Sequence, residues 1–117
     1  MVREFITLSV FDKQWASLGL DDNDLASLQE SLLESPRAAP VIQGTGGVRK
    51  VRFAFRNKGK SGSVRVLYVD LENCTVIYLL FAYAKGTKEN ITEAEKKAVK
   101  ELVEGLKDDY KGGYRYE

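Results

Sequence analysis

The fold is decided by the stretch Lys50-Val51-Arg52-Phe53-Ala54-Phe55-Arg56, in which basic and apolar side chains alternate. Successive side chains of a β-strand point to opposite faces, so this period of two predicts a strand with one buried face and one cationic face. Asn57–Ser63, rich in Gly and Lys, predicts a mobile hairpin tip that returns the chain into a second strand, Val64–Val69. A turn at Leu71–Cys74 leads into Thr75–Lys85, which is apolar on both faces and therefore typical of a central strand.

The residues before this sheet predict one strand and two helices. Phe5–Val10 has the mixed alternation and β-branched content of a first strand. A short helix that ends at Gly19 is predicted by the helical spacing of Phe11, Trp15 and Leu18. A second helix is expected from an N-cap at Asp21 or Asp22 to Ser35-Pro36, with an apolar stripe made of Leu25, Leu28, Leu32 and Leu33.

A loop and a final helix complete the predicted order. Ala38–Gly47 is expected to be a loop, and its Gly44-Thr45-Gly46-Gly47 cluster a turn, because a phosphate-binding loop would lead into a helix and end in Gly-Lys-Ser/Thr. Thr92-Glu93-Ala94-Glu95 matches a capping box, so the last helix should begin there, end near Lys107–Tyr110 and leave a flexible tail over 111–117. This order predicts a single domain over residues 1–117, an α+β fold with a mainly antiparallel sheet, two N-terminal helices and one C-terminal helix.

The charges of this chain are unevenly distributed, although its net charge is only +1. No acidic residue occurs between Val41 and Val69, whereas Glu4–Glu34 is mostly acidic. A concentrated positive face is typical of proteins that bind nucleic-acid phosphates. The interval holds seven basic residues, namely Arg49, Lys50, Arg52, Arg56, Lys58, Lys60 and Arg65. For Arg49, Lys50, Arg52 and Arg56, the simpler alternative to nucleic-acid binding is a strand face that is exposed to solvent. For Lys58 and Lys60 the simpler alternative is that they keep a loop soluble.

The absence of histidine excludes several classes of enzyme. Histidine is the side chain that ordinarily titrates near neutral pH, so Ser-His and Cys-His hydrolysis and paired-histidine cleavage of RNA are ruled out. The lone Cys74 cannot form an internal disulfide or a zinc site, and no clustered set of carboxylates suggests a metal-dependent nuclease. We expect Asp70 and Glu72 to be turn and hairpin residues, and we expect no cofactor and no metal.

The hydropathy pattern does not indicate a membrane protein. The longest apolar run, around Val76–Ala84, is far shorter than the ~20 residues that a membrane-spanning helix needs. Met1-Val2-Arg3-Glu4 does not open a signal peptide. A cytoplasmic location is therefore expected.

Several different short motifs follow one another through nearly the whole chain. They are Ser9-x-Phe11-x-Lys13-x-Trp15, Val41–Phe53, Lys58–Gly62, Arg65–Tyr68, Tyr78–Leu80, Tyr83–Lys85 and the late element with Ile91, Thr92, Glu95 and Lys96. Taken together at this spacing, they resemble the HigB branch of the RelE/ParE superfamily of toxins from type II toxin-antitoxin systems.

The resemblance implies a microbial RNase fold and a ribosome-dependent endoribonuclease that cuts messenger RNA and is held silent by a HigA-like helix-turn-helix antitoxin. In that family the substrate 2′-hydroxyl attacks its own adjacent phosphate without a metal. The positions that match the basic catalytic residues are Lys50, Arg52 and Arg65. The chain departs from RelE at Gly86, where that protein carries an arginine, which leaves Lys85 as the candidate for this cationic role. The tyrosine that stacks on the substrate base has four candidates: Tyr83, Tyr110, Tyr114 and Tyr116.

Internal attack on RNA needs a base, stabilisation of the extra negative charge on phosphorus, and an acid for the leaving oxygen. A guanidinium presents a fixed fork of donors to phosphate oxygens, so Arg52 and Arg65 suit charge stabilisation. Neighbouring cations favour the deprotonated form of a lysine or tyrosine, so Lys50, Lys85 and Tyr83 are candidates for acid and base. Phosphate contact without chemistry is expected of Arg49, Arg56, Lys58 and Lys60.

Two other functions of the same fold stay open on the sequence. One is a non-enzymatic inhibitor of DNA gyrase, as in the ParE branch. The other is an inactive module that binds only RNA or the antitoxin, which the departure at Gly86 would allow.

Overall fold

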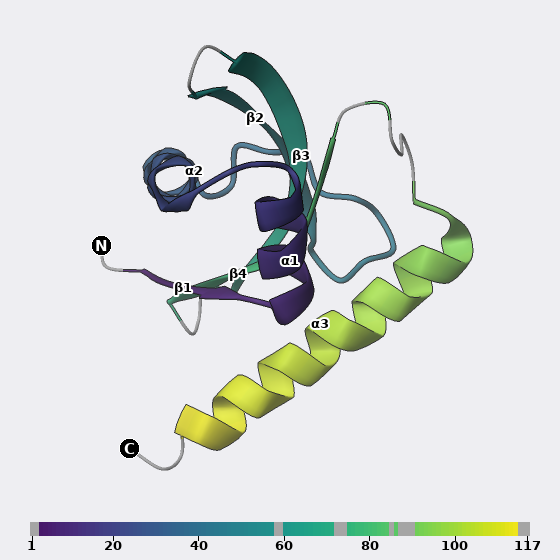
Figure 1. Cartoon of the computed structure of the whole chain (residues 1–117). Helices are drawn as coiled ribbons and strands as arrows, with labels where there is room; N and C mark the ends of the chain where they lie inside the picture. The colour runs from purple at the N-terminus through teal and green to yellow at the C-terminus, as the bar shows by residue number, and fades with distance from the viewer. Residues whose placement is uncertain (1–2, 58–59, 72–74, 85, 87–90, 115–117) are drawn as a thin grey trace.

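The structure, a computed structural model, describes residues 3–57, 60–71, 75–84, 86 and 91–114, with the backbone alone for 56, 57, 60, 61 and 109–114. Its elements are β1 (Glu4–Thr7), α1 (Ser9–Ser17), α2 (Asp22–Glu34), β2 (Arg49–Asn57), β3 (Lys60–Leu71), β4 (Val76–Ala84) and α3 (Glu93–Tyr114). Figure 1 shows two N-terminal helices, the sheet and one C-terminal helix. The predicted element order and the α+β class are confirmed.

The four strands form one sheet in the order β1-β4-β3-β2. β2 and β3 pair antiparallel, as do β3 and β4, whereas β1 lies parallel to β4. The sheet is therefore mainly antiparallel, as predicted. β4 lies between two other strands and its first five residues are all buried, which confirms the central strand expected from its apolar sequence.

Side chains from the two faces of the sheet form two separate hydrophobic clusters. One cluster joins the sheet to α1 and α2 and includes Phe11, Trp15, Leu28, Leu32, Val64, Val66, Tyr68, Ile77 and Leu79. The other joins the sheet to α3 and includes Leu67, Val69, Leu71, Val76, Tyr78, Leu80, Val99 and Val103. Val51, Phe53 and Phe55 of β2 pack on the first cluster. Lys50 and Arg52 consequently lie on the face of the sheet that α3 covers in part.

The capping box predicted at Thr92–Glu95 is present, and the expected N-cap of α2, Asp21, forms a second one with Asp24. The Asp21 carboxylate accepts a hydrogen bond from the Asp24 N–H, and the Asp24 carboxylate accepts one from the Asp21 N–H, each at 2.9 Å. At α3, the Thr92 hydroxyl accepts from the Glu95 N–H at 3.1 Å and the Glu95 carboxylate accepts from the Thr92 N–H at 2.8 Å. These side chains satisfy backbone donors that the first turn of a helix leaves unpaired.

The Gly44–Gly47 cluster is the predicted turn. The Thr45 hydroxyl is fully buried, donates to the Ile42 carbonyl and accepts from the Val48 N–H at 3.1 Å, so it closes the turn from inside. A side-chain carbon at Gly46 would lie 3.5 Å from Lys100 Cγ, which places this turn against α3.

Several boundaries differ from the prediction. β1 ends at Thr7, and Ser9 and Val10 already belong to α1, where Phe11 and Trp15 stack with ring centroids 5.4 Å apart. Leu33 was expected in the buried stripe of α2 but is 43% exposed, because it lies ~100° around the helix from buried Leu32. None of the helices in the described part of the chain is both long and apolar enough to cross a membrane.

Two elements are longer than predicted. The strands of the β2–β3 hairpin continue to the pair Asn57↔Lys60, so most of the expected tip is strand. Gly62 lies directly opposite Phe55, and a side-chain carbon added at position 62 would be only 3.1 Å from the Phe55 ring. α3 continues past its expected end to Tyr114, because glycine in a helix costs only about 1 kcal/mol and does not forbid it.

Candidate nucleic-acid interface

Three of the predicted site residues stand in one row across the sheet. Arg52 of β2 is directly opposite Arg65 of β3, and Arg65 is directly opposite Tyr83 of β4. Directly paired residues project to the same face, and their Cβ atoms are about 5 Å apart. We call Arg52, Arg65 and Tyr83 the cross-strand row. Lys50, opposite Leu67, lies two residues before Arg52 on the same face, so the structure brings four candidates together.

The pairing of two arginines in this row is electrostatically unfavourable. Like charges directly opposite in a sheet destabilise it. Arg52 is exposed, but Arg65 is partly buried between β2 and β4. The Nη1 atom of Arg65 is buried, and no residue in the described part of the chain accepts a hydrogen bond from it. A buried, unsatisfied guanidinium donor next to a second arginine is an arrangement that an anion such as phosphate would stabilise.

A hollow of about 480 Å³ adjoins the cross-strand row on the same face. We call it the α3 hollow. Its floor comes from β3 and β4, one side from the start of α3 and another from α1. Its lining residues are Gln14, Leu67, Phe81, Tyr83, Ile91, Glu95, Ala98 and Val99. Tyr83 thus belongs both to the row and to the hollow.

Gln14 is a site residue that sequence reasoning missed. Its Oε1 accepts a hydrogen bond of 2.8 Å from the Ala82 N–H, on the edge of β4 beyond the end of β1. The bond attaches α1 to β4 beside Tyr83. Gln14 follows two other polar residues of α1, Asp12 and Lys13, and nothing in the sequence distinguished it from them. The contact depends on how α1 lies along the strand edge.

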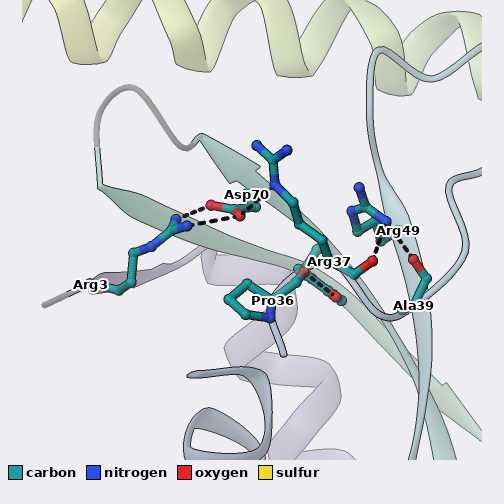
Figure 2. A network of polar contacts seen from close by, with 7 residues as sticks. Arg3, Pro36, Arg37, Ala39, Arg49 and Asp70 are labelled. Atoms are coloured by element: carbon teal, nitrogen blue, oxygen red, sulfur yellow. Dashed lines mark hydrogen bonds and ion pairs between the residues drawn. The ribbon is translucent and has the colours of Figure 1, made fainter. Parts of the chain in front are cut away.

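Arg49 lies away from the other predicted cations. It is opposite Tyr68, on the face that packs against α1 and α2. Its Nη1 donates to the carbonyl oxygens of Arg37 at 2.9 Å and Ala39 at 2.6 Å, as Figure 2 shows. Arg49 therefore anchors the segment after α2 to the sheet and does not join the cross-strand row.

Asp70 also differs from the prediction, because it lies within β3 and not in a turn. Its carboxylate forms a bidentate ion pair with Arg3, and both side chains are at least 95% buried. The Arg37 Nε lies 3.6 Å from the same carboxylate (Figure 2). Glu72, expected beside it, is outside the described residues.

The phenol of Tyr68 completes this polar network. It is fully buried and donates a hydrogen bond of 2.8 Å to the Pro36 carbonyl. Burial raises the pKa of Tyr68, nearby Arg49 opposes that shift, and the Asp70 carboxylate adds to it. Tyr68 is therefore a core residue.

The remaining candidates are described in part or not at all. Lys58, Lys85 and Tyr116 lie outside the described residues, and the side chains of Arg56, Lys60, Tyr110 and Tyr114 are also outside them. Gly86 has a φ of +87°, a left-handed conformation that strains any other L-residue, so the local backbone disfavours an arginine there. Within the described residues, no three acidic or cysteine side chains gather closely enough to hold a metal ion.

Comparison with known proteins places these features in a family. The family model described as the RelE toxin of the RelE/RelB toxin-antitoxin system matches residues 9–111. Among solved structures, a doubly arginine-to-alanine substituted E. coli toxin RelE in the free state is similar to this chain, with a TM-score of 0.56 and 20% sequence identity. That match covers 87% of this chain and 99% of the RelE chain. The structural likeness shows that the two chains share a fold.

Proposed function

Because this chain belongs to the RelE toxin family of toxin-antitoxin systems, we propose that it is a HigB-type toxin that cleaves messenger RNA on the ribosome. The observation that carries the proposal is the cross-strand row, with Lys50 beside it on the same face. Two facing arginines and an unsatisfied buried guanidinium donor suit a phosphate that gains negative charge during a reaction.

The reaction that these residues fit is internal transesterification of RNA. The 2′-oxygen forms a bond to the adjacent phosphorus as the 5′-oxygen leaves, which gives a 2′,3′-cyclic phosphate and a 5′-hydroxyl. Arg65 and Arg52 would donate hydrogen bonds to the non-bridging oxygens. Lys50, Tyr83 and Lys85 are the candidates for removing the 2′-hydroxyl proton and for protonating the leaving oxygen. No step requires a metal.

The partners follow from the same proposal. A HigA-like helix-turn-helix antitoxin would hold the toxin silent, and the ribosome would present the message. Arg56 and Lys60, in the last residue pairs of the β2–β3 hairpin, are proposed to contact RNA phosphates, and so is Lys58, which lies between them in the sequence. Because the ribosome would present the message, the proposal includes a cytoplasmic location.

The test is to induce the chain in bacteria and map the 5′ ends of messenger RNA. New cuts within translated codons are expected, and Arg65→Ala should abolish them. Lys97→Ala, which removes an exposed cation on α3, should cut as the original chain does. Purified ribosomes with a defined message would then show whether cleavage needs the ribosome.

Growth arrest with intact messages would contradict the proposal. If the purified toxin then inhibited DNA gyrase, and Arg65→Ala did not change that inhibition, gyrase inhibition as in the ParE branch would replace messenger RNA cleavage as the proposed function. If the induced chain caused no growth arrest and no cleavage, the inactive binding module would be the better explanation.

A further inference from the structure

The alternation of side chains along β4 is reset at Phe81. Up to Leu80, the even-numbered residues of β4 pack on the α3 side of the sheet, and the odd-numbered residues pack on the side of α1 and α2. Phe81 lies on the α3 side as Leu80 does. From there the order is reversed, because Ala82 packs with α1 and α2 and Tyr83 packs on the α3 side.

The pairing of β4 with β3 explains this change. Tyr68 of β3 is opposite Leu79, and the preceding residue, Leu67, is opposite Phe81. Leu80 is therefore an extra residue in β4, which makes the irregularity a β-bulge. Bulges redirect the side chains that follow them and are common beside functional sites.

The bulge decides which side chain of β4 stands beside Arg65. Regular pairing, counted three positions along each strand from the pair of Tyr68 and Leu79, would put Ala82 opposite Arg65. Tyr83 would then point toward α1 and α2. With the extra residue, Tyr83 is opposite Arg65 and joins the cross-strand row.

Gln14 of α1 contacts β4 just after the bulge. The last bond from the β1 segment to β4 runs from the Leu8 N–H to the Leu79 carbonyl, and the Ala82 N–H is then accepted by Gln14 Oε1 at 2.8 Å. Backbone N–H groups of successive strand residues point to opposite edges of the strand. The Ala82 N–H points toward α1 in the bulged register, whereas regular pairing would turn it toward β3.

We propose that Gln14 is a positioning residue that holds β4 in the bulged register and thereby keeps Tyr83 beside Arg65. Ala82 is only 1% exposed, so without Gln14 the bulged register would leave a buried N–H unsatisfied, and regular pairing would gain by comparison. This inference rests on the proposed function, because it adds the residue that places one of the acid and base candidates.

The main alternative is that Gln14 only fastens α1 to the sheet. Loss of the bond would then lower the stability of the protein, but the molecules that remain folded would keep Tyr83 in place and would cut messages at the full rate. The position of Tyr83 and the cleavage rate of the folded protein therefore separate the two roles.

The placement is tested by NMR of the full chain. Gln14→Met removes the acceptor and keeps the length of the side chain. Exchange of the Ala82 amide proton should become about tenfold faster, as expected for one lost hydrogen bond. The nuclear Overhauser contact between the backbones of Arg65 and Tyr83 should weaken. Gln14→Glu retains an acceptor oxygen and should keep both signals, and Lys13→Met, the same new residue at an exposed position of α1, is the matched control.

The consequence for cleavage is tested with purified ribosomes and a defined message. Gln14→Met should lower the maximal rate by about tenfold or more, the usual effect of misplacing a reacting group. The toxin concentration that gives half of the maximal rate should stay the same, because Arg52 and Arg65 are unchanged. If Gln14 acts through Tyr83, the double variant Gln14→Met/Tyr83→Phe should be no slower than Tyr83→Phe alone.

Four results would overturn the inference. They are unchanged exchange of the Ala82 amide in Gln14→Met, a full cleavage rate in folded Gln14→Met, a full rate in Tyr83→Phe, and losses that multiply in the double variant. An original chain that cuts no message would instead reject the proposed function. The Ala82 exchange and the contact between Arg65 and Tyr83 would still decide whether Gln14 holds the register, so the two failures are distinguishable.

Discussion

Arg65 combines two unfavourable features at one position, a like charge directly opposite and a buried guanidinium nitrogen without an acceptor in the described part of the chain. We predict that Arg65→Met reduces messenger RNA cleavage by about 10²–10³-fold, the usual effect of losing a donor to transition-state charge. The free energy of unfolding should stay the same or rise by up to about 1 kcal/mol, because the repulsion from Arg52 disappears. Cleavage assays and urea unfolding of the same preparations measure both quantities. A loss of stability larger than about 1 kcal/mol would mean that Arg65 is mainly structural.

Tyr68 makes the stability depend on pH in the alkaline range. Its folded-state pKa is raised by burial, so its contribution is complete below the unfolded pKa of about 10 and is lost as pH rises through the folded value. We predict that the original chain loses more stability than Tyr68→Phe between about pH 9 and pH 11. Near neutral pH the variant should be about 1 kcal/mol less stable, because the Pro36 carbonyl loses its donor. Parallel urea titrations across this pH range would show it, and identical pH profiles would refute it.

At the scale of one element, α2 depends on its first turn. Asp21 and Asp24 satisfy each other's backbone N–H groups, and Leu28 and Leu32 of the same helix enter the core. Asp21→Ala should lower the free energy of unfolding by about 1 kcal/mol, the usual cost of losing an N-cap. Asn23→Ala, an exposed change in the same turn, is the control and should have little effect. If both variants unfolded at the same urea concentration as the original chain, the capping box would be unimportant for stability.

At the scale of the whole molecule, the buried pair of Arg3 and Asp70 connects the N-terminal strand region to β3 (Figure 2). Removal of one partner leaves a buried charge uncompensated, which typically costs about 3–5 kcal/mol. We predict a loss of this size for Asp70→Asn and a smaller one for the double variant Arg3→Met/Asp70→Leu, which removes both charges. Thermal and urea unfolding of the three chains would measure the difference. A double variant less stable than Asp70→Asn would show that the pair stabilises beyond charge compensation.

The contacts of Arg49 show why this residue does not lie with the other predicted cations. Arg49 was grouped with Lys50 and Arg52 because they are close in the sequence, yet adjacent residues of a strand point to opposite faces. The alternation of β2 therefore already contained the signal that Arg49 faces α2. What the alternation could not supply was its partners, the Arg37 and Ala39 carbonyls, which depend on the path of the chain after α2.

The sequence by itself determined the local features of this protein: the two-residue period of β2, the apolar run of β4 and the capping residues of α2 and α3. Each depends on neighbours within a few positions, so elementary stereochemistry predicts it. Only the tertiary structure decided that Arg52, Arg65 and Tyr83 share one row and that Gln14 and Glu95 meet at one hollow. Strand register and helix docking come from packing between distant segments, and a shift of one residue would have turned the arginines of neighbouring strands to opposite faces.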